Sequence, residues 1–306
     1  MHTRWVGSSA VGERYGGPCE VASRSPCWSD QIPCSRETPG SLGLPRRRGG
    51  ILARYRAGHR QHIVAIAARQ RDRVNDWVII DGRFNGPPNS ANGGYTCGLV
   101  GTAVDAPSVR VSLHKPPPLE VPLLRRTEDD GSVSLLRGDD VIASGVPAVV
   151  QAQARPAPTV EEAELATRRY VGFAHHRFPT CFVCGTARED GLRIYAGQVG
   201  DGPLIASPWT PQSDDPLFVW AVLDCPGAYA IESVDHRAQV VVLASLTVEL
   251  RERPRAGERH VVAAWPVGSE GRKHHSASAL YDEAGRVLAI ADSLWIELRD
   301  PAAFAP

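Results

Sequence analysis

The sequence predicts an α+β protein built from two similar halves, each with an antiparallel sheet wrapped around one central helix. Residues 92–104 and 216–231 are apolar stretches of helical length. Each is followed by about four segments that alternate polar and apolar residues, as half-buried strands do. A strand segment also precedes each helix, so the order strand, helix, antiparallel strands occurs twice, as an internal repeat of about 100 residues. A helix that is apolar nearly all round must be covered, and a curved sheet is the expected cover.

The first half is predicted to span residues 76–150. It opens with a strand and loop at DWVIIDGRFNG, continues with a helix that starts at the glycine pair of NGGYTCGLVGTAV, and ends with four strands. The Pro- and Ala-rich stretch QAQARPAPT and a short amphipathic helix form a linker, residues 151–174. The second half, residues 175–298, repeats the order: a strand pair within residues 190–211, a helix at PLFVWAVLDCPGAYAI, and four strands.

Composition favours a globular protein without a nucleic-acid or membrane partner. The chain has 306 residues, of which 42% are hydrophobic and 22% charged, and its formal net charge is zero. No apolar run approaches the roughly 18 residues of a membrane-spanning helix. The seven cysteines are an odd, irregularly spaced set, unlike a secreted disulfide framework, so we expect a cytoplasmic protein.

Residues 1–62 differ from the rest of the chain. They hold ten arginines against four acidic residues, and they show neither helical nor strand periodicity. Such a segment is typical of a disordered tail, or of a spurious extension added by a wrongly chosen start codon. A basic arm for nucleic acid is disfavoured, because the aromatic spacing of a stacking surface is missing.

Two stretches of the second half resemble a known family. CFVCGTAREDGLRIYAG, residues 181–197, resembles the Cys-Phe-x-Cys-Gly…Gly-Leu motif of phenylacetate-pathway-type thioesterases, which have the hotdog fold. Residues 257–296 resemble the closing strands of that superfamily, with the turn DEAGRVLA before the last strand. The resemblance extends over residues 76–150 and 175–298 and is weaker in the first half. It implies two tandem hotdog domains, in which one chain replaces a homodimer. The implied activity is hydrolysis of acyl-CoA or acyl-carrier-protein thioesters, with no cofactor beyond the CoA of the substrate.

The resemblance also implies where the site lies. In these thioesterases a His-Gly-Gly-like turn begins the helix, an Asp or Glu follows seven residues after the second glycine, and each site combines the turn of one partner with the acid of the other. The first half has the turn, Asn92-Gly93-Gly94, but Gly101 at the acid position. The second half has Asp224 at the acid position, but Asp215-Pro216-Leu217 at the turn. The surviving parts are therefore expected to form one composite site per chain.

The chemistry of this composite site follows from its parts. The free N–H groups and positive end of a helix N-terminus suit a thioester carbonyl oxygen, so Gly93 and Gly94, with Asn92 nearby, are predicted to polarise it. Asp224 is predicted to act as general base on water or as nucleophile. The alternatives are an N-cap role for Asn92 and, for Asp224, an exposed position or a hydrogen bond near a helix break at Cys225-Pro226-Gly227. The acyl chain is expected between the two helices.

Four further residues are candidates for binding substrate. Asn85 and Asn89 precede the glycine turn and can orient substrate or water, although both also suit an ordinary loop. Arg272 and Lys273 stand in the GRKHH stretch and can meet the phosphates of CoA, or can form a solvated strand end.

The pair Cys181-x-x-Cys184 invites a different interpretation. With His175 and His176 close by, it resembles half of a structural zinc site, which needs four ligands. The sequence has no second pair of this spacing, and the family motif accounts for the first. We therefore expect no metal.

The main rival to hydrolysis is a non-catalytic protein that binds or senses acyl-CoA. Two halves that have each lost one part of the site are also expected of a protein that descends from an enzyme and has lost catalytic activity. A dehydratase of the same fold is disfavoured, because that branch relies on a catalytic His near the helix start and neither half has one. Further assembly of such pseudo-dimers into homo-oligomers is expected of this superfamily.

Overall fold

The computed structural model describes residues 75–234 and 240–300, and all of them belong to one compact unit. The predicted N-terminal extension, residues 1–62, lies outside the described residues. Within the described ranges, no helix is long and apolar enough to cross a membrane.

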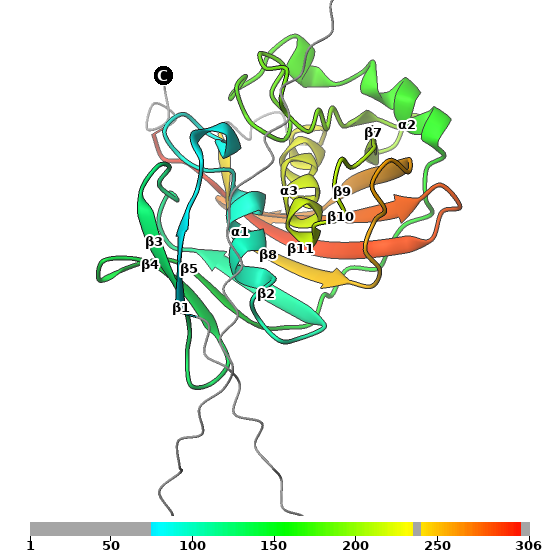
Figure 1. The fold of residues 1–306 in the computed structure, drawn as a ribbon. Helices are drawn as coiled ribbons and strands as arrows, with labels where there is room; N and C mark the ends of the chain where they lie inside the picture. Colours follow the sequence, from blue (N-terminus) through cyan, green and yellow to red (C-terminus); the bar gives the residue numbers. More distant parts are fainter. Residues whose placement is uncertain (1–74, 235–239, 301–306) are drawn as a thin grey trace, which may run out of the picture. The chain divides into compact units, whose positions relative to one another are not determined.

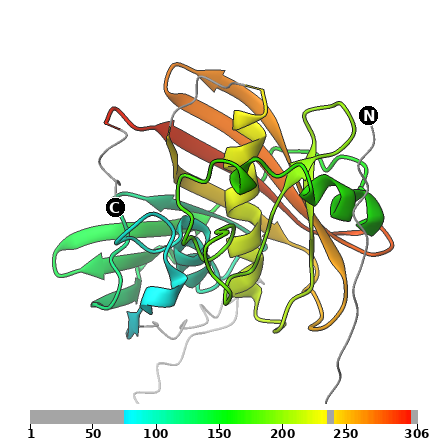
Figure 2. The same cartoon turned by 90° about the horizontal axis from the view of Figure 1, so that it is seen from above.

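The described residues form one continuous antiparallel sheet that curves around two helices (Figures 1 and 2). These helices are α1 (Gly93–Gly101) and α3 (Pro216–Glu232); a third, α2 (Val160–Thr167), and two 3-10 turns, Gly82–Phe84 and Val171–Phe173, lie in the connections. In sheet order the strands are β1 (Asn75–Ile79), β3 (Pro122–Thr127), β4 (Val133–Arg137), β5 (Asp140–Pro147), β2 (Ser108–Leu113), β8 (Val241–Leu250), β11 (Val287–Glu297), β10 (Lys273–Asp282), β9 (His260–Glu270), β7 (Ile205–Trp209) and β6 (Gly197–Gln198).

The two halves meet at the pairing of β2 with β8. This antiparallel ladder runs from Ser108 opposite Glu249 to Ser112 opposite Ser245. Strands β1–β5 lie on one side of this junction and β6–β11 on the other. The order strand, helix, antiparallel strands therefore occurs twice within a single sheet, while the predicted domain boundaries at residues 76–150, 151–174 and 175–298 stay predictions.

Both apolar stretches are helices, and each is followed by the four predicted strands. One predicted strand is largely missing: the first of the pair within residues 190–211 is reduced to β6. The reason is local, because Leu192 and Ile194 donate their N–H groups to the carbonyls of Phe182 and Val183, at 2.8 and 2.9 Å. These backbone groups hold the Cys-Phe-x-Cys turn and are not available to a neighbouring strand.

The sequence suggests a helix break at Cys225-Pro226-Gly227, but no break occurs, since α3 continues to Glu232. A proline inside a helix removes one backbone hydrogen bond, which usually costs several kcal/mol. Here the helix is buried on most sides, and Ser278 of β10 donates a hydrogen bond to the carbonyl of Leu223, one turn before Pro226, at 2.7 Å. Tertiary packing therefore overrides the local signal.

Glycines let α1 and α3 pack in direct contact, side by side on the same side of the sheet (Figures 1 and 2). A Cβ atom added at Gly94 would lie 2.5 Å from the Cβ of Asp224, and one added at Gly101 would lie 2.3 Å from the ring of Trp220. Any side chain at these positions would force the helices apart. This contact places the start of α1 against the middle of α3.

The linker and α2 cover the opposite face of the second half of the sheet. Val160 and Ala163 of α2 pack with Ala206, Ala263 and other small residues of β7 and β9–β11 in a separate apolar cluster. The helix begins with a capping box, in which Thr159 and Glu162 each accept a backbone hydrogen bond from the other. The second half of the sheet therefore has buried residues on both of its faces.

Candidate active site

The carboxylate of Asp224 lies on the N-terminus of α1. Its Oδ2 accepts hydrogen bonds from the N–H of Gly94 at 2.8 Å and from the side-chain Nδ2 of Asn92 at 3.1 Å. Its Oδ1 is buried and has no hydrogen-bond partner among the described residues. The structure thus brings together the predicted turn of the first half and the predicted acid of the second, which are 130 residues apart in the chain.

Asn92 has two functions at this point. Its Oδ1 accepts a hydrogen bond from the N–H of Tyr95 at 2.8 Å, so it is the N-cap of α1, as the alternative interpretation held. Its Nδ2 at the same time contacts Asp224 and, more distantly, two cysteine sulfurs.

Burial raises the pKa of Asp224 from its ordinary value of 3.8 to about 7. The side chain is only 3% exposed, so its ionised form loses most of its hydration. The nearby Cys181 raises the pKa further, whereas the hydrogen bonds from Gly94 and Asn92 lower it. The result is a carboxyl group that changes its charge near neutral pH, which suits a general base.

The two glycines of the turn differ in what they contact. The N–H of Gly94 is already bonded to Asp224, and Gly94 is buried. Gly93 lies in the wall of a cavity, and its N–H has no partner among the described residues, as expected for the first residue of a helix. Of the two predicted carbonyl donors, only Gly93 is therefore open to a ligand in this structure.

The second, pseudo-equivalent position has neither part of a site. Gly101 stands where an acid would be, and the ring of Trp220 fills the space that a carboxylate side chain would need. At the start of α3, Pro216 has no N–H, and the N–H of Leu217 is bonded to the side chain of Asp215 at 2.9 Å. The sequence predicts that this second position lacks both the acid and the glycine turn. The structure agrees, because the ring of Trp220 leaves no room for an acid at position 101.

A cavity of about 380 Å³ opens beside the carboxylate. Its wall includes the N-cap residue Asn92, Gly93 of α1, Asp224 and Tyr229 of α3, and Leu243 of β8. Small-molecule sites usually measure about 300–1,000 Å³ and have a mainly apolar wall with a few polar groups. The helices α1 and α3 touch, and the cavity extends along the second half of α3, β8 and β11. That the acyl chain lies between the two helices stays a prediction.

Asn85 and Asn89 do not line this cavity. The side chain of Asn85 contacts Thr180 at 3.1 Å and accepts a hydrogen bond from Arg188 at 2.9 Å, so it fastens the cysteine-containing loop to the first half. Asn89 is exposed and has φ 60°, in a turn closed by a hydrogen bond from Ser90 to Pro87. This left-handed conformation is one that Asn tolerates well, which matches its interpretation as a loop residue.

Arg272 and Lys273 are exposed at the β9–β10 hairpin and do not line the cavity. Arg272 donates to the carbonyl of Glu297 at 2.8 Å, and Lys273 pairs with Ile296 of β11. Two other cations, Lys115 and Arg177, do line it, and sequence reasoning missed both. Nothing in their local sequence distinguishes them from other surface cations.

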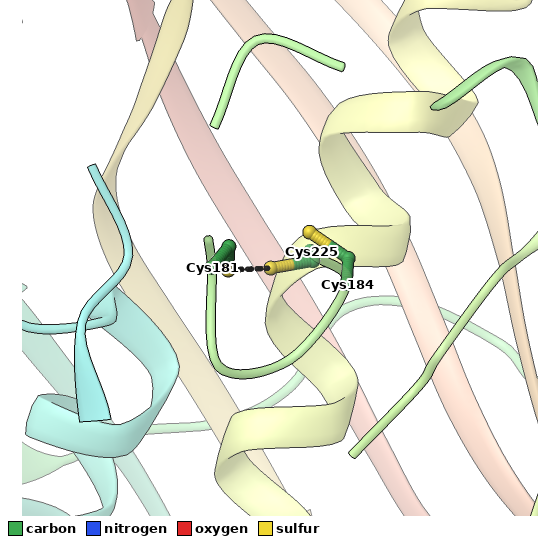
Figure 3. Close-up of side chains that lie close together, drawn as sticks. All are labelled: Cys181, Cys184 and Cys225. Carbon is green, nitrogen blue, oxygen red and sulfur yellow. Dashed lines mark hydrogen bonds between the residues drawn. The ribbon is translucent and has the colours of Figure 1, made fainter. Parts of the chain in front are cut away.

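Sequence reasoning also missed Cys225, which follows Asp224 directly. Its sulfur lies 3.7 Å from that of Cys181, and the sulfurs of Cys181, Cys184 and Cys225 all lie within 4.8 Å of one another (Figure 3). Hydrogen bonds from the two neighbouring thiols lower the pKa of Cys181, and the interaction with Cys181 raises the pKa of the other two. No local signal in the sequence could have found this cluster, because its two segments are 44 positions apart in the chain.

No known protein family matches the chain by sequence, and no curated protein does either. Solved structures do match. A putative thioesterase II from Thermobifida fusca YX is 16% identical with a TM-score of 0.51, over 74% of this chain and 92% of its own. A putative thioesterase from Novosphingobium aromaticivorans DSM 12444 is 13% identical with a TM-score of 0.52, over 72% and 94%.

The chain has the hotdog fold. The resemblance predicted from CFVCG and the closing strands is thereby confirmed at the level of the fold. A hot dog fold protein of unknown function from Alicyclobacillus acidocaldarius also matches, at 10% identity and a TM-score of 0.40, over 74% of this chain and 94% of its own.

Proposed function

We propose that the protein hydrolyses acyl thioesters, of CoA or of an acyl carrier protein, at one composite site per chain. The observation that carries this proposal is the carboxylate of Asp224 on the N-terminus of α1, in the wall of the cavity. In this proposal one chain with two tandem hotdog halves does the work of a dimer. A cytoplasmic location, a lack of cofactors and further assembly into homo-oligomers stay predictions of the sequence.

The reaction needs a base for water and a donor for the carbonyl oxygen. Oδ1 of Asp224, which has no protein partner among the described residues, takes a proton from a water molecule in the cavity. That water attacks the thioester carbon, and the N–H of Gly93 receives the oxygen as negative charge develops on it. The carbon–sulfur bond then breaks, and the thiolate of CoA leaves with the proton that Asp224 took from the water, which returns Asp224 to its ionised form. Asn92 and Gly94 hold the other carboxylate oxygen in place throughout.

The cavity suits the two ends of such a substrate. Apolar residues of β8 and β11, among them Leu243 and Trp295, offer a wall for an acyl chain. Lys115 and Arg177 are cations that line the cavity and suit the phosphates of CoA better than the predicted Arg272 and Lys273 do.

The experiment is a panel of acyl-CoAs of several chain lengths, aliphatic and aromatic, offered to the purified chain while loss of thioester absorbance is followed. Melting temperature is measured with the same compounds. We expect turnover of at least one acyl class together with ligand-dependent stabilisation. A protein that neither turns over nor is stabilised by any of them would refute the proposal.

One observation favours the alternative, a non-catalytic acyl-thioester-binding protein. The N–H of Gly94, a donor that a carbonyl oxygen would use, is occupied by Asp224 itself. If the remaining donor, the N–H of Gly93, does not by itself stabilise the negative charge that develops on the oxygen, the protein binds the thioester without cleaving it. Stabilisation by acyl-CoAs without turnover is the result that would select this alternative.

A further inference from the structure

Three thiols from two separate segments converge beside the candidate active site. Cys181 and Cys184 belong to one loop, and Cys225 belongs to α3, as Figure 3 shows. All three are free cysteines and line the same cavity as Asp224. Because the sulfurs of Cys181 and Cys225 are 3.7 Å apart, the two thiols are in contact but not bonded.

The loop is built to present two thiols on the same side. The N–H of Gly185 donates to the carbonyl of Cys181 at 2.8 Å, which closes a tight turn. A Cβ atom added at Gly185 would lie 2.5 Å from that carbonyl oxygen, so the turn requires glycine. A pair of cysteines separated by two residues in a tight turn is the usual half of a tetrahedral metal site.

The distances fit a metal ion bound by thiolates. Zinc–sulfur bonds of about 2.3 Å in a tetrahedron place the sulfurs about 3.8 Å apart. Cys181 and Cys225 already have this separation, and Cys184 completes a set that lies within 4.8 Å. A small movement of one side chain therefore forms the site.

Polar groups around the sulfurs are those that a thiolate site uses. Nδ2 of Asn92 lies 3.6 Å from the sulfur of Cys225 and 3.9 Å from that of Cys181. The hydroxyl of Tyr229 lies 3.9 Å from the sulfur of Cys184. Donors of this kind stabilise the charge of coordinating thiolates and orient them.

His176, considered from sequence as a zinc ligand, is engaged elsewhere. Its Nδ1 accepts a hydrogen bond from the N–H of Phe178 at 3.0 Å, so the proton of the neutral ring is on Nε2. Nε2 then donates to the carbonyl of Cys184 at 2.8 Å. His175 is exposed. The fourth position is therefore left to a water or small ligand from the cavity.

We propose that Cys181, Cys184 and Cys225 bind one thiophilic metal ion, with zinc(II) as the probe, through three thiolates. This revises the sequence-based expectation of no metal, which weighed the cysteine pair with His175 and His176 but not Cys225. The proposal does not depend on hydrolysis, because binding is measured directly. Each thiol that coordinates gives up its proton, so binding of one zinc(II) releases up to three protons and leaves a complex of net charge −1.

The test is a zinc titration of the full-length, reduced chain against a chromophoric chelator, with proton release measured by calorimetry in two buffers. Cobalt(II) is used in parallel, because thiolate-to-cobalt charge-transfer absorption reports sulfur ligands directly. We expect one tight ion per chain, release of two to three protons, and strong charge-transfer absorption. A melting temperature that rises with zinc and falls with chelator is expected as well.

Variants assign the ion to this cluster. Cys225→Ser should weaken zinc binding at least tenfold to a hundredfold, and Cys184→Ser serves as a second variant if the first folds poorly by near-UV circular dichroism. Two controls should bind as the wild type does. One is Cys97→Ser, a buried cysteine of α1 outside the cluster. The other replaces the three cysteines of residues 1–74 with serine.

Three results would overturn the proposal. The first is zinc affinity that is unchanged in both cluster variants, and the second is binding that is lost in the variant without the cysteines of residues 1–74. The third is a Cys181–Cys225 disulfide, found by mass spectrometry in the chain as purified, together with no metal binding after reduction.

Discussion

Replacing Asp224 with Asn should raise the free energy of unfolding above that of the wild type at neutral and alkaline pH. At acidic pH the variant should have no such advantage. In the wild type, the folded state keeps a proton on Asp224 up to about pH 7, whereas the unfolded chain loses it near pH 3.8. Between these values the folded state binds more protons than the unfolded state, so the free energy of unfolding falls as pH rises. Above the folded pKa the whole penalty for ionising the buried group is present.

The magnitude follows from the two pKa values. Each pKa unit corresponds to about 1.4 kcal/mol, so a pKa raised from 3.8 to about 7 amounts to about 4 kcal/mol lost by the wild type across this window. The amide oxygen of Asn can accept both hydrogen bonds that Oδ2 of Asp224 accepts now. Its NH₂ group then replaces the unpartnered Oδ1, at a pH-independent cost of about 1–3 kcal/mol.

The assay is urea unfolding of both proteins from about pH 4 to about pH 8, with a chelator present so that no ion changes the charge beside Asp224. The difference in unfolding free energy between Asn variant and wild type should grow in favour of the variant by about 4 kcal/mol across this range. Asp190→Asn is the control, because Asp190 is exposed and its hydrogen bond from Arg188 lowers its pKa. Parallel pH curves for Asp224→Asn and wild type would refute the argument from burial.

Two further substitutions test the parts around the carboxylate. Asn92→Ala removes both the cap of α1 and a hydrogen bond that lowers the pKa of Asp224, so it should cost about 2–3 kcal/mol and move the pH midpoint of hydrolysis upward. Thr159→Ala, which removes the cap of α2, should leave that midpoint unchanged, and an equal midpoint in both variants would count against a role for Asn92. Arg177→Gln should raise the KM for an acyl-CoA, but not the KM for the matching acyl-pantetheine, which lacks the nucleotide phosphates of CoA. Arg272→Gln should change the KM of neither substrate. If both substitutions have the same effect, Arg177 does not belong to the substrate site.

Periodicity and spacing predict much of this molecule. The helices α1 and α3 are visible as apolar stretches of helical length, and the strands after them as alternating polar and apolar residues. The partnership of Gly94 with Asp224 is predictable only from the family spacing, applied to each half separately. Nothing in the local sequence at either residue indicates a partner 130 positions away.

Other features depend on contacts that no local pattern encodes. The cysteine cluster escapes prediction because Cys225 looks like one more small residue of a buried helix until the loop of Cys181 is placed beside it. The unbroken course of α3 through Pro226 depends on burial by the sheet and by α1. Gly93 and Gly94 differ in function because the carboxylate of Asp224 accepts a hydrogen bond from the N–H of Gly94, which leaves the N–H of Gly93 open to a ligand.

The central claim is that the carboxylate of one half and the helix start of the other form a single hydrolytic site. The most direct test is the rate of hydrolysis of the best acyl-CoA by wild type and Asp224→Asn, both metal-free, at about pH 8, where Asp224 is ionised. The account predicts a loss of kcat of about 10²–10⁴-fold in a variant that remains folded. An undiminished rate in the folded variant would contradict it.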